Sequence, residues 1–499
     1  MLKSKYNIIL LICLGFVAIN YFGKYLFLRI DLTENKAFTL SKATKDVMKS
    51  LDGKVEITAY FSKDLPIDIA KSREELDHLL NEYSSLSKGN LSYQFVDPNE
   101  SPALEEEAGK AGIRPVMINV REKDQAKQQK AFLGAVIKAD EKTEVIPVIQ
   151  PGIAMEYAFT TGIKKLVGKN KPKLGFIQGH GEATLQEMPQ AYQSLSILYD
   201  LASTYTQYDT VDLSAFKTLI MVRPKDSISP AQFDRLDQYL SNGGQVVLAF
   251  NQVDANIQYG MATAMNTGIK TWLESKGLQV DDALVRDARC GQVNVTQQQG
   301  FFSFSTPVQF PYLPLIQSFT NHPITKGIEQ ILLEFASPLQ FKGHPDYDFT
   351  PLIMTSDHSS REAVPLRFDV QRNWTDADFN EKNIAVGGVL KNKSGNGGSL
   401  IVFSDGDFAV NGSEQRRLNE DNISLLVNSI DFLSDDTGLI DLRTKSVETR
   451  PIKELDDATR NTLKYLNFLM PIGLAILYGI FRFNRNRQIR VKRMEERYS

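Results

Sequence analysis

Two long apolar stretches lie near the two ends of the chain. Residues 8–28 read IILLICLGFVAINYFGKYLFL, and residues 463–483 read LKYLNFLMPIGLAILYGIFRF. A helix rises about 1.5 Å per residue, so each stretch can cross a hydrocarbon core of roughly 30 Å. Pro471 and Gly473 fit the second stretch because transmembrane helices tolerate such residues better than soluble helices do. The pattern therefore predicts one transmembrane helix at each end.

The first apolar stretch also has features of a signal peptide, so cleavage is the alternative. No small-x-small cleavage site follows it, and it is longer than the apolar part of an ordinary signal peptide. Ile12 stands before Cys13, where a lipoprotein signal needs a small residue. We therefore expect an anchor that is neither cleaved nor lipidated.

Between the two stretches, the alternation of apolar and polar positions predicts two folded domains. In residues 36–167, Ser41 is placed to cap the helix KATKDVMKSLD, and the strand VEITAYF follows. A helix, the strand LSYQFVD, a second helix and further short strands come next. This order predicts a thioredoxin-like α/β domain. It has no C-x-x-C motif, which excludes thiol redox chemistry.

Residues 172–440 show helical periodicity that alternates with short, continuously apolar runs. The runs KLGFIQ, FKTLIMV, QVVLAF and LIVFS have the composition of parallel strands covered on both faces. We therefore predict an α/β fold with a doubly wound sheet. Residues 290–383 are less regular and indicate a β-rich insertion or an extension of the sheet edge. Residues 441–462 are predicted to be an extended linker that leads back to the membrane.

Basic residues flank the outer ends of both apolar stretches, in residues 1–7 and 484–499. Because cytoplasmic flanks carry the excess of Lys and Arg, both termini are predicted to be cytoplasmic. The protein is then expected in the inner (cytoplasmic) membrane, with a large periplasmic domain. The net charge is −3. Without the basic ends the middle of the chain is near about −10, which excludes nucleic acid as a partner.

Polar side chains follow each of the four apolar strands at its carboxyl end. Ligands of doubly wound sheets bind in the crevice beyond these ends. The candidate ligand-binding residues are His180, Glu182, Arg223, Asp254, Asp405 and Asp407. They converge only if the four strands are neighbours, which the pattern alone does not reveal. A common site at this edge of the sheet is therefore a hypothesis.

The GHGE segment at residues 179–182 has two interpretations. As a tight turn, its glycines give the backbone freedom, His180 bonds a neighbouring loop, and Glu182 lies near the start of the next helix. As a ligand pocket, it would hold a sugar or a peptide end group. We favour the turn because polar clusters mark functional sites only statistically. The same preference applies to Asp405 and Asp407, whose oxygens suit loop capping.

The sequence lacks the common catalytic and metal-binding motifs. There is no G-x-x-x-x-G-K-[ST] phosphate loop, so the chain is not an ATPase. The four other histidines have no H-x-x-x-H or H-E-x-x-H spacing, which argues against a zinc hydrolase. With Cys13 in the membrane, Cys290 has no partner for a disulfide or a cysteine metal site. We expect no metal or cofactor and predict that the chain is not an enzyme.

Several segments, taken in order, resemble the gliding-motility-type auxiliary subunits of ABC transporters. They are DLTENKAFTLS, GFIQGHGE, VRPKDSISPAQFDRLDQYLSNGGQVVLAF, NHPITKGI, VFSDGDFAVN, LVNSIDFLSDDTGLIDLR and the final apolar span with its basic tail. The resemblance implies a glutamine-amidotransferase-like extracytoplasmic domain. The usual nucleophile of that superfamily is a cysteine on a strand-to-helix elbow, and Cys290 has no such elbow. The resemblance also leads us to expect an acidic residue after QVVLAF, where this chain has Asn251.

The resemblance implies a non-enzymatic subunit that works beside a separate ABC permease and, through it, a cytoplasmic ATPase. Two spans are too few to enclose a transport path alone. Small residues allow close helix packing, and Gly473, Ala475 and Gly479 offer such a surface to the permease. The extracytoplasmic domain would bind a partner or substrate, for example an envelope protein or a glycan, and couple it to the permease.

Two other functions stay open. The first is a membrane-anchored envelope hydrolase that uses His180, Glu182 and Asp405. The second is an anchored solute-binding protein that delivers a small molecule. Identifying the proteins that co-purify with this chain from membranes would separate these functions from the auxiliary-subunit hypothesis.

Overall fold

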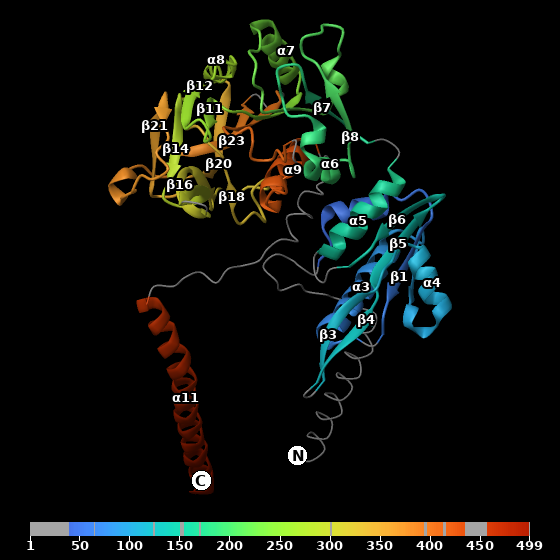
Figure 1. Ribbon diagram of the computed structural model, residues 1–499. Helices are drawn as coiled ribbons and strands as arrows, with labels where there is room; N and C mark the ends of the chain where they lie inside the picture. Colours follow the sequence, from blue (N-terminus) through green and yellow to red (C-terminus); the bar gives the residue numbers. More distant parts are fainter. Residues whose placement is uncertain are drawn as a thin grey trace. The chain divides into compact units, whose positions relative to one another are not determined.

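A computed structural model (Figure 1) describes residues 39–498 except 64, 123–124, 150–153, 169–170, 300–301, 394–396, 413–415 and 435–456. It divides into two compact units, Met1–Glu448 and Thr449–Ser499. The predicted first span at residues 8–28, the tail up to residue 7 and the extended stretch up to residue 456 lie outside the described residues. Their predictions are not tested by the structure.

The first part of the chain builds a four-stranded sheet of order β2-β1-β5-β6. β1 is parallel to β2 and antiparallel to β5, which is antiparallel to β6. Its strands are β1 (Val55–Phe61), β2 (Leu91–Val96), β5 (Leu133–Ala139) and β6 (Lys142–Ile146), and β3 (Val116–Glu122) pairs with β4 (Gln125–Ala131). The helices are α2 (Lys42–Lys49), α3 (Ile67–Leu86), α4 (Pro102–Lys110) and α5 (Ala154–Val167), with the 3-10 turn η1 (Pro98–Glu100). The thioredoxin-like assignment stays a prediction.

A ten-stranded sheet forms the centre of the second part of the chain. Its main path is β13-β19-β23-β24-β10-β9-β7-β8, and β20 pairs with both β23 and β17. The parallel strands are β7 (Lys173–Ile177), β8 (Asp200–Thr204), β9 (Thr218–Val222), β10 (Gln245–Ala249) and β24 (Ser399–Phe403). The antiparallel strands are β13 (Leu278–Val280), β17 (Ser318–Phe319), β19 (Leu339–Phe341), β20 (Tyr347–Met354) and β23 (Ala385–Asn392).

Helices cover both faces of this sheet, as the apolar runs predict. On one face, α6 (Pro189–Leu195) and α9 (Glu420–Ser434) pack in a core that includes Val247. On the other face, α7 (Pro230–Ser241) and α8 (Ile269–Glu274) pack in a core that includes Val246 and Leu248. Successive side chains of β10 therefore enter opposite cores, which is why the strand has no polar face. Two further 3-10 turns are η2 (Leu185–Glu187) and η3 (Leu213–Ala215).

The segment 290–383 is rich in β structure. Part of it joins the main sheet as β17, β19 and β20, and the rest forms small separate ladders. These ladders contain β15 (Cys290–Gln299), β16 (Phe302–Ile316), β18 (Ile331–Leu332), β21 (Ser359–Ala363) and β22 (Leu366–Arg367), followed by η4 (Asp376–Asp378). Their partners from earlier in the chain are β11 (Val253–Asn256), β12 (Met261–Ala264) and β14 (Ala283–Asp287). The segment is thus both an insertion and an extension of the sheet.

The described residues of the unit Thr449–Ser499 form one helix, α11 (Asp457–Tyr498). Within it, Thr459–Val491 is long and apolar enough to cross a membrane, with a mean hydropathy of 1.6 in its most apolar window and none of that window buried. It is the one such helix among the residues that the structure describes. The predicted apolar helix at residues 463–483 is therefore present, and it passes through Pro471 without a break.

Candidate functional site

The strand order brings together the carboxyl ends that the sequence singled out. β24, β10, β9 and β7 are consecutive neighbours and run parallel, so the loops after them leave the same edge of the sheet. Arg223 follows β9, Asn251 follows β10, and Asp405 and Asp407 follow β24. These residues form one hydrogen-bonded group, which we call the strand-end cluster. His180 and Glu182, after β7, form a second group.

Arg223 is the cation of the strand-end cluster. Its Nη1 lies 3.3 Å from Asp407 Oδ1, and its Nη2 lies 2.8 Å from Glu187 Oε1. The backbone of Arg223 has φ of 56°, a left-handed conformation that non-glycine residues rarely adopt. Its amide donates to the Ala249 carbonyl at 2.8 Å. Its Nε is buried and has no hydrogen-bond partner among the described residues.

Asn251 connects the loops after β10 and β24. Its Nδ2 donates to Asp407 Oδ2 at 2.7 Å, and its Oδ1 accepts the Gly406 amide at 2.6 Å. The position therefore needs a donor and an acceptor on one short side chain, which an amide supplies. An aspartate here would place another carboxylate against Asp407. This geometry explains why the chain departs from the acidic residue that its resemblance led us to expect.

Asp405 is a structural carboxyl group within the cluster. It is 1% exposed, and its two oxygens accept the amides of Glu334 at 2.6 Å and Asp407 at 2.7 Å. Burial, and after it the negative charge of Asp407, raises the pKa of Asp405 well above its usual value. Asp405 thus holds the β24 loop in place, in agreement with the loop-capping interpretation.

His180 and Glu182 form a buried pair of their own. His180 Nδ1 lies 2.9 Å from Glu182 Oε1, the His180 amide donates to Glu182 Oε2 at 2.6 Å, and His180 Nε2 lies 2.9 Å from Gln232 Nε2. The His180 carbonyl accepts the amides of Lys225 and Asp226. The hydrogen bond to Glu182 raises the pKa of His180. Every polar atom of His180 is thus engaged in tying loops together.

The glycines and acidic residues of this loop differ in role. Gly181 has φ of 74°, the left-handed conformation that the turn interpretation requires. Glu182 lies two residues before the N-cap of η2, Thr184, and its carboxylate bonds back to His180. Glu187 caps the next turn instead, since Thr184 and Glu187 form a capping box. The Thr184 amide, and then Arg223, lower the pKa of Glu187.

Asp254 does not belong to the strand-end cluster. It lies in β11, where it is exposed and faces Thr263 of β12 across the ladder. The chain after β10 turns into this hairpin, so Asp254 is carried out of the crevice. The sequence analysis did not identify Glu187 and Gln232, each of which occupies the N3 position of a capping box. The spacings T-x-x-E at 184–187 and S-x-x-Q at 229–232 were the available signals.

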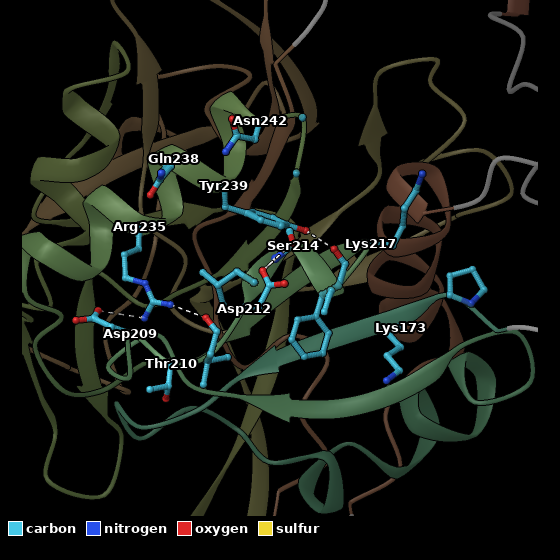
Figure 2. Close-up of a pocket in the computed structure, with 17 residues that line it drawn as sticks. Lys173, Asp209, Thr210, Asp212, Ser214, Lys217, Arg235, Gln238, Tyr239 and Asn242 are labelled. Carbon is cyan, nitrogen blue, oxygen red and sulfur yellow. Dashed lines mark hydrogen bonds and ion pairs between the residues drawn. The ribbon is translucent and has the colours of Figure 1, made fainter.

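Two cavities lie at opposite edges of the sheet. A small one of about 190 Å³ adjoins the strand-end cluster and is lined by Leu332, Glu334, Asp407, Phe408, Arg416, Arg417, Leu418, Asn419 and Asn422. A wider one of about 810 Å³ lies at the amino ends of β7 and β9, between α7 and the loop 209–217. Figure 2 shows Arg235 and Asp209 at one side of it and Lys173 and Lys217 at the other. Ligands of doubly wound folds bind at the carboxyl edge, which favours the smaller cavity.

Cys290 is the first residue of β15 and pairs across the ladder with Pro314. Burial raises the pKa of its thiol, which disfavours the thiolate that a nucleophile needs. Over the described ranges of the chain, no three His, Cys, Asp or Glu side chains are placed to hold a metal ion. The absence of enzyme activity stays a prediction.

The chain is similar to several known proteins. An uncharacterized protein of Borreliella burgdorferi is 24% identical, over 92% of this chain and 94% of that protein. The N-terminal domain of mmIFT52 has 14% identity and a TM-score of 0.37, covering 53% of this chain and 97% of that one. PurLQS from Thermotoga maritima has 11% identity and a TM-score of 0.28, covering 53% and 100%. Structural likeness this low implies nothing about activity.

Two families match the sequence. Residues 34–138 match a domain of unknown function. Residues 171–435, just over half of the chain, match the family described as an ABC-type uncharacterized transport system. That match spans the ten-stranded sheet, its covering helices and the strand-end cluster. The chain therefore belongs to the family of the ABC-type uncharacterized transport system, and its role is an accessory one in transport.

Proposed function

We propose that this protein is a non-enzymatic, membrane-anchored auxiliary subunit of an ABC transporter of the gliding-motility type. Its extracytoplasmic domain binds a partner or substrate, and its membrane helices couple that event to a permease and a cytoplasmic ATPase. Family membership supports the link to transport. The amidotransferase-like character of the second domain and the periplasmic location are parts of the same proposal.

The observation that carries the proposal is the exposed surface of α11. Its side chains from Leu463 to Phe483 are almost all exposed, although the segment is strongly apolar. Ala475 and Gly479 are four residues apart and share one helix face, where a neighbouring helix can approach closely. Gly473 lies two residues before Ala475, which is a rotation of roughly 200° about the helix axis, so it is on a different face. A Cβ atom added at Gly473 or at Gly479 meets nothing within 4 Å, so both positions are open.

Packing on the permease is tested by co-purification from membranes. Replacing Gly473 and Gly479 together with Leu should sharply reduce the amount of permease recovered, because bulk at these positions keeps the helices apart. The single variants show which face of α11 packs on the permease. We expect Gly479→Leu to account for most of the loss of recovered permease. Leu477→Ala is the matched control on the same helix. Full recovery of the permease with the double variant in the membrane would contradict the proposal.

The strand-end cluster supports binding without catalysis. A nucleophilic mechanism needs a nucleophile within reach of a base, which in turn is oriented by a third group. His180 and Asp405 belong to different hydrogen-bonded groups, and Arg223 occupies the one strained strand end in the cluster. His180 and Glu182 are thus committed to each other, and Asp405 is committed to backbone amides. This arrangement disfavours the hydrolase built on His180, Glu182 and Asp405.

One second candidate is an anchored solute-binding protein. The cavity of about 190 Å³ beside Asp407 favours it, because its position is the usual ligand position of such sheets. Isothermal titration of the full-length protein with pooled small metabolites tests this function. A saturable signal that Asp407→Asn removes would favour solute binding over partner binding.

A further inference from the structure

Helix α11 is longer than a bilayer requires. It has 42 residues, which corresponds to a length of about 63 Å, whereas a bilayer with its headgroups is about 40–45 Å thick. The apolar part ends at Phe483, and about 22 Å of helix follow it. The helix does not break at this boundary. It therefore carries its polar continuation through the headgroup layer as a rigid extension.

Arginines begin where the apolar part ends. Arg482, Arg485, Arg487 and Arg490 are all exposed and lie within about 12 Å along the helix axis. This length matches one headgroup layer together with part of the screening distance of about 8 Å beyond it. Among the side chains that the structure describes, no carboxylate forms an ion pair with these four. We call this set the arginine collar.

The angular spread of the collar identifies its partner. At 100° per residue, roughly, the four arginines cover about 200° of the helix circumference. A helix that docks on a protein presents a stripe about 100° wide. Of the five positions between these arginines, Asn484, Asn486 and Gln488 are also polar and exposed, whereas Phe483 and Ile489 are exposed and apolar, as suits the boundary of a bilayer. Lipid headgroups surround a transmembrane helix, so they can meet charges spread so widely, whereas one docked protein surface cannot.

We propose that the arginine collar binds the headgroups of anionic phospholipids. A guanidinium group can donate two parallel hydrogen bonds to a phosphate, and each basic residue near an anionic surface strengthens binding by about fivefold. The collar fixes the depth of α11 in the bilayer and concentrates anionic lipid around the helix. The proposal rests on the membrane crossing of α11, which the proposed function also assumes, but not on contact with a permease.

The test uses the full-length protein reconstituted in vesicles. Spin-labelled phosphatidylglycerol and spin-labelled phosphatidylcholine are added separately, and the ratio of their association constants with the protein is measured. We expect a preference of several-fold for phosphatidylglycerol that falls towards one at high salt. In the variant with all four collar arginines changed to Gln, the preference should be lost. Glutamine keeps the helix intact because its helix propensity is close to that of arginine.

Two matched variants complete the test. Changing the four collar arginines to Lys keeps the charge and should keep most of the preference. Removing the same charge from the other part of the protein should change nothing, and four exposed lysines serve for this: Lys138, Lys142, Lys382 and Lys391. Equal association of both lipids with the wild-type protein would overturn the proposal. So would an unchanged preference in the Gln variant together with loss of a co-purified cytoplasmic subunit, since the collar would then be a protein contact. Failure of permease packing alone would leave the lipid preference unaffected.

Discussion

Arg223 combines a strained backbone with a side chain that forms two ion pairs. A left-handed conformation costs a non-glycine residue on the order of 1–2 kcal/mol, so something must compensate for it at φ of 56°. The hydrogen bond from its amide to Ala249 and the ion pairs to Glu187 and Asp407 provide that compensation. At Gly406, an added Cβ atom would come within 2.9 Å of the Arg223 backbone. The β9 and β24 loops therefore hold each other in place.

The amide of Asn251 is predicted to be essential for the cluster. Asn251→Asp replaces a donor to Asp407 with a like charge, which should lower the free energy of unfolding by about 2 kcal/mol near neutral pH. The repulsion raises carboxyl pKa values, so the loss should shrink as the pH falls and these groups take up protons. Both tryptophans, Trp272 and Trp374, lie in this domain, so urea unfolding followed by tryptophan fluorescence reports on it.

The exposed Asn256 is the control for Asn251. It lies at the end of β11, and its side chain accepts the Tyr259 amide, with no carboxylate bonded to it among the described residues. Asn256→Asp should therefore change the free energy of unfolding by no more than about 0.5 kcal/mol. If Asn251→Asp and Asn256→Asp were equally mild at every pH, the cluster would not have the electrostatic balance described here.

His180 should make stability depend on pH. Its folded pKa is raised above 6.5 by Glu182, so its contribution is complete below about pH 6.5 and is lost as the pH rises through the folded value. We expect the free energy of unfolding to fall over this range in the wild type and to be flatter in His180→Gln. Tryptophan fluorescence in urea, measured at several pH values, checks this. Cellular function should survive His180→Gln, because the residue ties down a loop.

Gly181 provides the contrast to His180. Gly181→Val puts a β-branched residue at φ of 74°, with its Cβ about 3.1 Å from Lys225 Cβ, and should impair folding and function more than His180→Gln does. The reverse result would revive the hydrolase. That is, His180→Gln would abolish function in a folded, assembled protein while Gly181→Val was tolerated.

The sequence located most candidate residues but not their partners. Residues at the ends of apolar strands could be named because such strands are easily recognised, and Arg223, Asp405 and Asp407 do meet. Their convergence depends on strand order, which arises from long-range packing. Asp254 was wrongly expected in the crevice. The chain enters a hairpin within four residues of the end of β10, and this hairpin leads away from the crevice. Local spacing alone could not reveal that turn.

At the scale of elements, a buried polar group fastens α2 to α5. Glu156 of α5 is 5% exposed, and its Oε1 accepts the Ser41 amide at 2.8 Å and the Thr44 hydroxyl at 2.7 Å. Thr160 and Tyr83 extend this group, with 2.6 Å between their hydroxyl oxygens. Ser41 also caps α2, as its position in the sequence predicts. α2 is thus held at its first turn by a residue far away in the sequence.

Removing Glu156 should release α2. Glu156→Ala leaves buried donors without acceptors, at a cost of about 1–3 kcal/mol each, and should increase amide hydrogen exchange throughout Lys42–Lys49. Hydrogen exchange with mass spectrometry on the full-length protein measures this locally. Glu106→Ala in α4, which breaks an exposed ion pair with Lys110, should leave the exchange of α2 unchanged. Unchanged exchange of α2 in Glu156→Ala would refute the role of this group.

Long elements were predictable and short ones were not. The strand VEITAYF coincides with β1, as its alternating apolar and polar positions predict. QVVLAF contains β10, because a continuous apolar run implies burial on both faces. β17 and β18 have two residues each, too few for any period to show. The antiparallel place of β23 beside β24 was also hidden, since an apolar run does not show in which direction its strand lies in the sheet.

At the scale of the whole molecule, the basic flanks predict an orientation. A reporter fused after Ser499 should be active only in the cytoplasm, and one inserted in the turn at residues 391–399 should be active only outside. The excess of Lys and Arg after the apolar part of α11 is the physical reason. The turn joins β23 to β24, so an insertion there should leave both strands intact. Protection of that insertion from external protease in spheroplasts would reverse the predicted topology.

The way the ten-stranded sheet ends has a consequence for solubility. Its outer strands are β8, β13 and β17, which have only five, three and two residues. β23 pairs at its outer edge with both β19 and β20, and the sheet ends beyond them in the short strands β13 and β17. An exposed strand edge is a template on which other chains add strands and aggregate, and shortness removes it. Under the proposed membrane anchoring, which would hold many copies of this domain at high local density, these short edge strands would protect it against sheet-to-sheet association with its neighbours.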